Sequence, residues 1–275
     1  MKNKNSVFDN IEKQIGFDLI RAYLEQNVNS VAGKKKLGKL KFSRHFMSVQ
    51  KSLLLTKEMH SIKSAGESFP RIEFENILPL LSFVQVSGAV LDAKEIKDVG
   101  RCLAIYFQCK GFFFGKKKVL YPKLNGLFLY ILMSDALHQQ IQRTIDDDGE
   151  VLDSADSALG DIRRKLNTSR QKIRSKIQSV LDKSIKDGYS DKDMLPTIIN
   201  GRMVMPVKAE AKRIMPGLVH DESASGSTVY FEPSGLVDAN NEVKELILLE
   251  KRIIHRVLTK ISKQIADFLI ILACL

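Results

Sequence analysis

The chain has 275 residues, and its 43 Lys and Arg exceed its 32 Asp and Glu to give a formal net charge of +11. A hydrophobic fraction of 44% with 27% charged residues is typical of a globular protein and excludes both an intrinsically disordered chain and a collagen-like one. The positive excess suggests a polyanionic partner.

The cysteines and the apolar segments indicate the cellular compartment of the protein. Cys102, Cys109 and Cys274 include no CxxC pair, so they predict reduced thiols rather than a disulfide framework or a structural zinc site. The first residues lack the apolar middle region of an export signal. The longest apolar run, residues 268–275, is far shorter than the ~20 residues of a membrane-spanning helix. We therefore expect a cytoplasmic protein with no membrane partner.

Residues 1–154 are predicted to form an irregular helical core. Apolar residues recur at helical spacing over residues 8–24, 53–62 and 89–107. Prolines and glycines separate these stretches, as is typical of breaks between helices. Asp92, followed three residues later by Glu95, predicts a capping box at the start of one helix.

Two longer helices are predicted in the second half. Over residues 155–186, one narrow apolar stripe runs from Leu159 to Val180 with steps close to those of a coiled coil. Such a helix would be ~48 Å long at 1.5 Å per residue. A second helix is predicted over residues 236–275, where the apolar periodicity continues to the last residue without a stop signal, so we expect the chain to be cut within this helix.

Between these helices, residues 187–235 show the two-residue period of β-strands, and we call this segment the β tip. The Asn200-Gly201 pair predicts a hairpin that joins strands at Thr197–Ile199 and Met203–Val207. Pro206 predicts that the latter strand lies at an edge or is interrupted. Two further strands are predicted at residues 217–220 and 228–231. The expected fold is mainly α, with two long antiparallel helices carrying a small inserted antiparallel sheet.

The positive charge is concentrated on the first long helix and the early β tip. Residues 159–214 hold 14 basic and 6 acidic residues, a net +8, whereas residues 1–158 carry +5 and residues 215–275 carry −2. Cations on an exposed arm suggest contact with a phosphate backbone without base readout. The absence of Trp argues against stacking on single-stranded bases. Six residues are the predicted nucleic-acid contacts: Lys183, Lys186, Arg202, Lys208, Lys212 and Arg213.

Two possible ligand motifs fail on spacing. Residues 111–117 (GFFFGKK) have neither the spacing nor the hydroxyl residue of a phosphate-binding loop, so they predict a basic surface turn. If Gly149 is aligned with the invariant glycine of an EF-hand, Ala155 falls where a bidentate Glu is required. A turn with local Asx hydrogen bonds is the better interpretation of residues 146–150. We expect no metal and no cofactor in this chain.

A hydrolase site is also disfavoured. Residues 220–225 (HDESAS) contain a His, an Asp and two Ser, but neighbouring residues of a strand point in alternate directions and do not form a triad by themselves. The five histidines show no HExxH motif. The lysine runs at residues 34–36 and 116–118 are typical of solvated surface, with nucleic-acid contact as the less favoured alternative. No catalytic residue is predicted.

Four segments together resemble the N-terminal region of the second bacterial MutS subfamily, the paralogues associated with suppression of recombination. These are residues 145–155 with Ile162-Arg163-Arg164, residues 200–208, residues 217–233, and Asn240-Asn241. Phe17-Asp18 also fits the opening of the family, and the match runs in order along nearly the whole chain. The family usually has Arg at position 199 and an aromatic residue at position 203, where this chain has Ile199 and Met203.

The resemblance implies a helical core and lever interrupted by a DNA clamp, of which the β tip would be the end. It also implies a longer parent that is a dimeric, DNA-dependent ATPase using ATP and Mg, with a C-terminal Smr nuclease domain, and members have been linked to ribosome quality control. No Phe-x-Glu occurs, so direct mismatch reading is not expected. The chain ends before any Walker motif, so ATPase and endonuclease activity would belong to the parent.

The leading hypothesis is a non-catalytic fragment that clamps branched or duplex DNA through backbone phosphates. The alternatives are a dimerisation or assembly module, and a part that binds ribosomal RNA or the ribosome.

Overall fold

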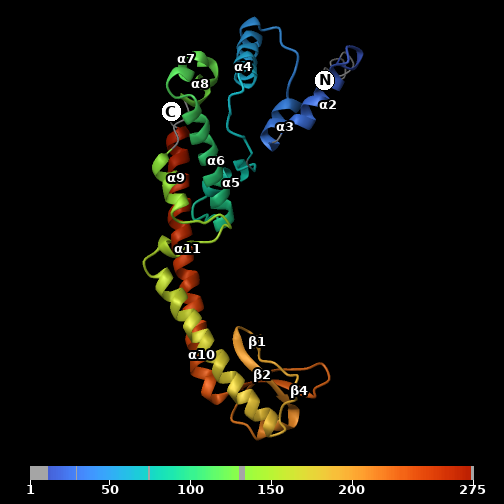
Figure 1. Ribbon diagram of the computed structural model, residues 1–275, viewed down its shortest axis with the longest axis vertical. Coiled ribbons are helices and arrows are strands. Elements are labelled where there is room, and N and C mark those ends of the chain that lie inside the picture. Colours follow the sequence, from blue (N-terminus) through green and yellow to red (C-terminus); the bar gives the residue numbers. More distant parts are fainter. Residues whose placement is uncertain (1–11, 29, 74, 130–133, 274–275) are drawn as a thin grey trace. The chain divides into compact units, whose positions relative to one another are not determined.

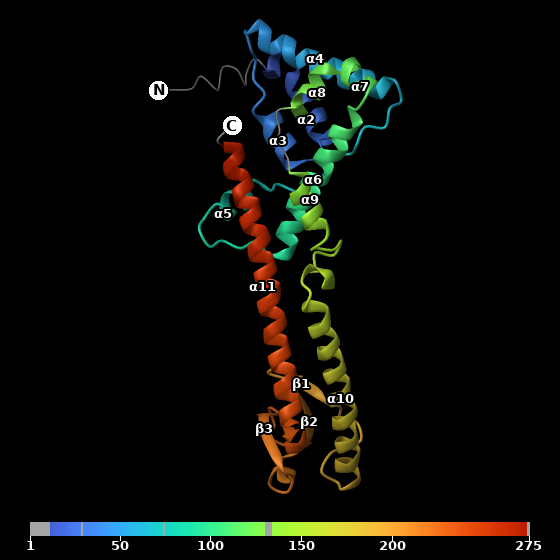
Figure 2. The same ribbon diagram turned by 90° about the vertical axis from the view of Figure 1, so that its left-hand side faces the viewer.

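The computed structural model describes residues 12–28, 30–73, 75–129 and 134–273. The chain divides into two compact units, which we call the first unit (residues 1–150 and 259–275) and the second unit (residues 151–258) (Figures 1 and 2). Residues 8–11 of the first predicted helical stretch and Cys274 lie outside the described residues. The prediction of a mainly helical protein with a small antiparallel sheet is confirmed.

Short helices make up most of the first unit. Polar residues before them fix several starts, because their side chains accept hydrogen bonds from N–H groups of the first turn. Ser30 accepts from Gly33 at 3.0 Å, and Asp92 and Glu95 form the predicted capping box. The helices are α2 (Phe17–Asn27), α3 (Val31–Gly38), α4 (Phe46–Ser64), α5 (Leu78–Val84), α6 (Ala93–Phe112), α7 (Lys116–Leu120), α8 (Pro122–Leu129) and α9 (Asp135–Gln142).

Buried side chains from α4, from α8 and from the residue that follows α6 hold part of this unit together. Ile62 and Leu124 pack with Phe113 in one apolar cluster. The Asx turn predicted at Asp146 is confirmed, since its Oδ1 accepts the N–H groups of Asp148 and Glu150 at 2.9 and 2.8 Å. Within the described ranges no group of acidic, His and Cys side chains is arranged to hold a metal ion.

The second unit contains α10 (Leu159–Lys186) and the beginning of α11 (Val237–Ala273). α10 starts at Leu159 rather than at Ala155, because the preceding residues form the 3-10 turn η1 (Asp153–Ala155) and Asp156 closes a turn by accepting the Ala158 N–H at 3.0 Å. Although α11 has 37 residues, none of the described helices is both long and apolar enough to cross a membrane.

The two helices of this unit lie side by side in both views (Figures 1 and 2). They are antiparallel, because residues later in α10 contact residues earlier around α11. Three contacts follow this order: Asp156 with Arg256 at 2.7 Å, Arg163 with Glu250 at 2.8 Å, and Lys176 with the Gly235 carbonyl at 2.7 Å. The predicted antiparallel pair is therefore confirmed.

All four predicted strands are present and form one antiparallel sheet with the order β1-β2-β4-β3. The strands are β1 (Thr197–Ile199), β2 (Arg202–Lys208), β3 (Gly217–Glu222) and β4 (Thr228–Pro233), with the 3-10 turns η2 (Ala209–Arg213) and η3 (Ser234–Leu236). Asn200 and Gly201 both have positive φ, 50° and 78°, as the tight hairpin turn between β1 and β2 requires.

β2 lies between β1 and β4 in the sheet, but its pairing with β1 ends before Pro206, so the predicted interruption is present on that side of the strand. β1 ends its pairing at Val204, so no strand lies beside Pro206 on that side. The Pro206 carbonyl points there and accepts a hydrogen bond from the Ser190 hydroxyl at 2.9 Å. The N–H and C=O of a residue in an antiparallel strand point to the same side. An N–H at position 206 would therefore point toward Ser190 and away from β4. Pro206 therefore breaks no bond with β4.

One apolar core joins the sheet to the helices of the second unit. Ile173, Ile177 and Leu181 of α10 pack on Met205 and Val207 of β2, all 2% exposed or less. The same cluster contains Phe231 of β4 and Val243 of α11. The β tip is therefore fixed on both helices by burial of apolar surface.

Candidate nucleic-acid interface

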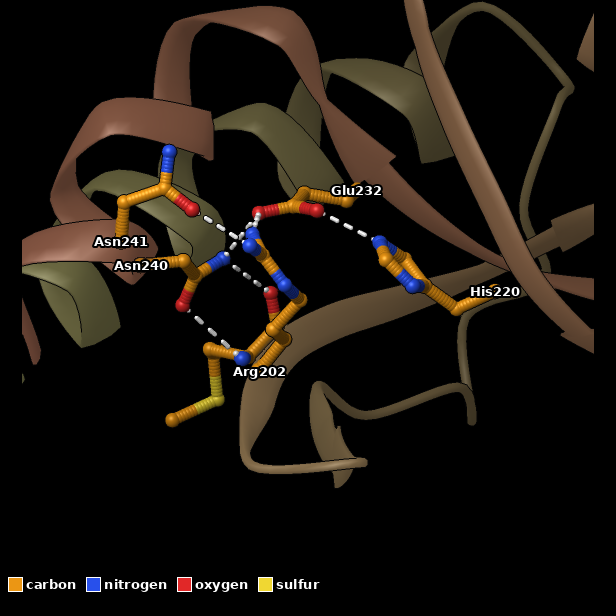
Figure 3. A network of polar contacts seen from close by, with 6 residues as sticks. Arg202, His220, Glu232, Asn240 and Asn241 are labelled. Carbon is orange, nitrogen blue, oxygen red and sulfur yellow. Dashed lines mark hydrogen bonds and ion pairs between the residues drawn. The ribbon is translucent and has the colours of Figure 1, made fainter. Parts of the chain in front are cut away.

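A fully buried carboxylate, that of Glu232 at the end of β4, lies at the centre of the β tip (Figure 3). Its Oε1 accepts hydrogen bonds from Arg202 Nη1 at 2.8 Å and from Asn240 Nδ2 at 2.7 Å. Its Oε2 lies 2.5 Å from His220 Nε2. Asn241 completes the group by accepting from Arg202 Nη2. We call these five residues the Glu232 network.

Asn240 acts in this network as a short substitute for a strand. β4 pairs with β2 from Met205 onward, which leaves the Met203 backbone without a strand partner on that side. The Asn240 side chain accepts the Met203 N–H at 3.0 Å and donates to the Met203 carbonyl at 3.1 Å. Its second N–H bonds Glu232, so all of its donors are used. The first turns of α11 are thereby joined directly to β2.

The backbone of β3 directs His220 toward Glu232. The register of β3 on β4 shifts between Val219 and Asp221, so His220 is the extra residue of a β-bulge, a feature that changes the direction of a side chain. Gly217 allows β3 to approach β4 closely, since a Cβ there would lie 2.2 Å from the Glu232 carbonyl oxygen. Ser223 and Ser225 bond each other and His220 bonds Glu232, so no Ser–His pair forms here.

Burial raises the pKa of Glu232, but the hydrogen bonds from Asn240, His220 and Arg202 outweigh it, and the net pKa lies below the ordinary 4.5. Folding therefore favours the ionised form. The associated stability is present above about pH 4.5 and is lost as the pH falls through the lower folded pKa.

We accordingly expect the stability advantage of the unmodified chain over Glu232→Gln to shrink as the pH falls below about 4.5. Urea unfolding of both chains between about pH 7 and pH 3 gives the difference between their free energies of unfolding. Other acidic groups titrate in both chains, so their contributions cancel in this difference. A difference that stays constant across this range would show that the ionised carboxylate contributes no stability.

The six predicted contact residues differ in how their charges are engaged. Arg202 is held by Glu232 and Asn241, and its side chain is 18% exposed. Lys208 lies 3.1 Å from Asp191 and Lys212 lies 3.2 Å from Glu222, each pair at the surface. Lys183, Lys186 and Arg213 are exposed and form no ion pair with a described residue. Arg202 thus supports the β tip from within, while the other five cations reach solvent.

Lys183 belongs to a row of lysines on α10 whose other members are not among the predicted contacts. Its members are spaced 7, 4 and 7 residues apart and so share one face of the helix at 100° per residue: Lys165, Lys172, Lys176 and Lys183. The apolar positions that face the core lie to one side of this row. Lys165, Lys172 and Lys183 are exposed and unpaired among the described residues, so they present charge along ~27 Å of the helix.

The second unit thus consists of antiparallel long helices that carry a small four-stranded sheet, with exposed cations along α10. In sequence, the chain is similar to proteins named Endonuclease MutS2. It is 34% identical over 262 residues to that of Listeria welshimeri, 33% over 254 residues to that of a Geobacillus strain, and 33% over 249 residues to that of Clostridium botulinum. These matches cover 94%, 91% and 90% of this chain.

The resemblance to the second bacterial MutS subfamily is thereby confirmed. The chain spans about a third of the length of these curated relatives, with 33%, 32% and 31% of them covered. No protein-family model matches the chain. Three of the four segments that carry the resemblance, namely residues 200–208, residues 217–233 and Asn240-Asn241, meet in the Glu232 network.

Proposed function

We propose that the second unit binds branched or duplex DNA through backbone phosphates, as the non-catalytic clamping part of a MutS-like, DNA-dependent ATPase. The observation that carries this proposal is the set of exposed, unpaired cations on α10 and η2, which faces solvent without aromatic side chains for base stacking. The relatives are named endonucleases, which supports a DNA-related role in repair or in suppression of recombination.

In this proposal each part of the chain has a separate task. Residues 1–154 form the helical core, residues 155–186 and 236–275 form the arms, and the β tip meets the DNA. Surface ion pairs contribute only about 0–1 kcal/mol, so a phosphate can replace Asp191 at Lys208 and Glu222 at Lys212. ATP hydrolysis with Mg, and nuclease activity, belong to the longer parent, which acts in the cytoplasm as a dimer.

The test is a salt series of binding between the 275-residue chain and a fluorescent branched duplex. Reversal of Lys208, Lys212 and Arg213 to Glu is expected to weaken binding by about tenfold or more and to reduce the slope of log K against log salt by up to about 0.9 for each lost contact. Fluorescence anisotropy gives both quantities.

The matched control reverses Lys51, Lys57 and Lys63, three exposed lysines of α4 in the first unit. This control changes the net charge by the same amount. A loss of affinity that both variants share therefore reflects the overall electrostatic field of the chain and not loss of direct contacts. If the β-tip variant keeps both affinity and slope, the tip does not contact DNA. Competition with structured RNA separates DNA from ribosomal RNA, and stronger binding of the RNA would favour a ribosome-associated role.

A second candidate function is an assembly module, and large exposed apolar side chains in the first unit favour it. Leu19 and Tyr23 of α2 are 73% and 68% exposed, and Phe46 and Met47 of α4 are each 73% exposed. Sedimentation distinguishes the two functions: a tight dimer without salt-sensitive binding of nucleic acid would favour assembly.

A further inference from the structure

A small apolar hollow lies in the second unit under the β1–β2 hairpin. Its volume is about 90 Å³, room for one aliphatic side chain but far less than the roughly 300 Å³ or more of a small-molecule site. The side chains that make it apolar come from α10, the hairpin and α11: Ile173, Ile198, Met203, Val243 and Ile247. A single side chain of a partner fits it better than a free ligand does.

The strand beside this hollow has an open edge. β1 pairs with β2 alone, and on its other side no strand of the described part of the chain is present. In a two-residue hairpin the pair that closes the turn, here Ile199 and Arg202, is hydrogen-bonded. In the next pair, Ile198 and Met203, the backbone N–H and C=O groups point away from the partner strand. The bonds from Asn240 to the Met203 backbone agree with this alternation. Ile198 therefore offers an N–H and a C=O to a partner strand.

The geometry of a strand links this open edge to the hollow. A partner residue hydrogen-bonded to Ile198 would have its side chain on the same face of the sheet as the Ile198 side chain, which lines the hollow. Ile198 is 63% exposed and Leu195, three residues earlier, is 72% exposed. Pro196 has no N–H, so the added strand would be short, and the hollow would provide much of the affinity.

The positive charge beside the hollow indicates which second residue a bound peptide would have. Arg170 of α10 lines the hollow, is exposed, and forms no ion pair with a described residue. An arginine at the rim of an interface favours a carboxylate partner and disfavours a basic one. A nucleic-acid strand would use this charge, but neither the apolar hollow nor the strand edge.

We propose that the hollow and the open edge of β1 bind an extended peptide of a partner protein, in which an acidic residue stands two positions from an aliphatic one, so that both side chains lie on the same face of the added strand. The peptide adds a short strand to β1, places its aliphatic side chain in the hollow and pairs its carboxylate with Arg170. This is strand addition with one side-chain pocket. The proposal is independent of DNA binding by the lysine row and η2.

The probe is a fluorescein-labelled peptide, Ser-Asp-Thr-Leu-Thr-Asp-Ser, titrated with the 275-residue chain. Saturable binding is expected, together with chemical-shift changes at the amides of residues 197–199. Ile198→Asp and Arg170→Glu are each expected to weaken binding about tenfold or more. Both side chains are exposed, so the fold is retained. Lys172→Glu, with the same charge change elsewhere on α10, is expected to change the affinity less than about twofold.

Two further peptides test the chemistry: one has Gly in place of Leu, and the other has Lys in place of both Asp. Equal binding of either peptide would overturn the proposal, as would the absence of saturable binding at millimolar peptide. If the peptide does not bind and Arg170→Glu weakens branched-DNA binding, the hollow belongs to the DNA surface and the proposal is wrong. Self-association that Ile198→Asp abolishes would assign the edge to a second copy and equally overturn it.

Discussion

Replacing Glu232 with alanine is expected to lower the free energy of unfolding of the second unit by about 3–5 kcal/mol. The carboxylate is fully buried and accepts hydrogen bonds from Arg202, Asn240 and His220. Its removal leaves the largely buried charge of Arg202 without its ion-pair partner, and a buried donor without an acceptor costs its full desolvation. Amide hydrogen exchange of the 275-residue chain, followed on peptides from residues 197–243, measures the opening free energy.

Glu222→Ala is the matched control, because Glu222 also lies in the sheet and pairs with a cation but is 52% exposed. It is expected to change the opening free energy by less than about 1 kcal/mol. Glu232→Gln keeps the side-chain volume and removes the charge, so an intermediate loss is expected. Equal effects of Glu222→Ala and Glu232→Ala would contradict a central role for the Glu232 network.

Reversing Lys165, Lys172 and Lys183 to Glu is expected to lower the affinity for branched duplex DNA by an order of 100-fold at low salt. Each lysine of the row that contacts a phosphate contributes about 0.9 to the slope of log K against log salt, so the slope should fall by up to about 2.7. The three side chains are exposed and share one face of α10, so a duplex beside that face could engage them together.

The Lys51, Lys57 and Lys63 reversal again controls for net charge. Substituting the three α10 lysines with Gln separates loss of contact from added repulsion, and it should retain most of the slope change with a smaller loss of affinity. Circular dichroism checks that α10 remains helical. An unchanged slope in both α10 variants would place the DNA elsewhere on the chain.

Local patterns predicted much of the fold. The hairpin at Asn200-Gly201 and the capping box at Asp92 depend on a few adjacent residues, and both are present. Apolar periodicity predicted the two long helices, and the β segment between them predicted that they run antiparallel. The interior position of β2 could not be predicted, because it depends on pairing with β4, whose residues lie 20 or more positions away along the chain.

The candidate site was less accessible to sequence reasoning. Lys183, Lys186 and Arg213 were chosen from local charge, and the structure places them in solvent. The same reasoning predicts Arg202 as a contact but not its ion pair with Glu232. The two residues are 30 positions apart, and the local charge of the sequence does not show that they meet. The lysine row was visible in the sequence, but only when positions are projected onto a helix rather than counted.

The bonds of Asn240 to the backbone of β2 fix the rotation of α11 about its own axis. One residue along a helix corresponds to a turn of 100° and a rise of 1.5 Å, so no neighbour of Asn240 can reach Met203 if the helix slips. One residue inserted between Pro233 and Asn240 would turn the amide away from β2. The backbone of β2 thus sets the angular register of α11 through the side chain of Asn240.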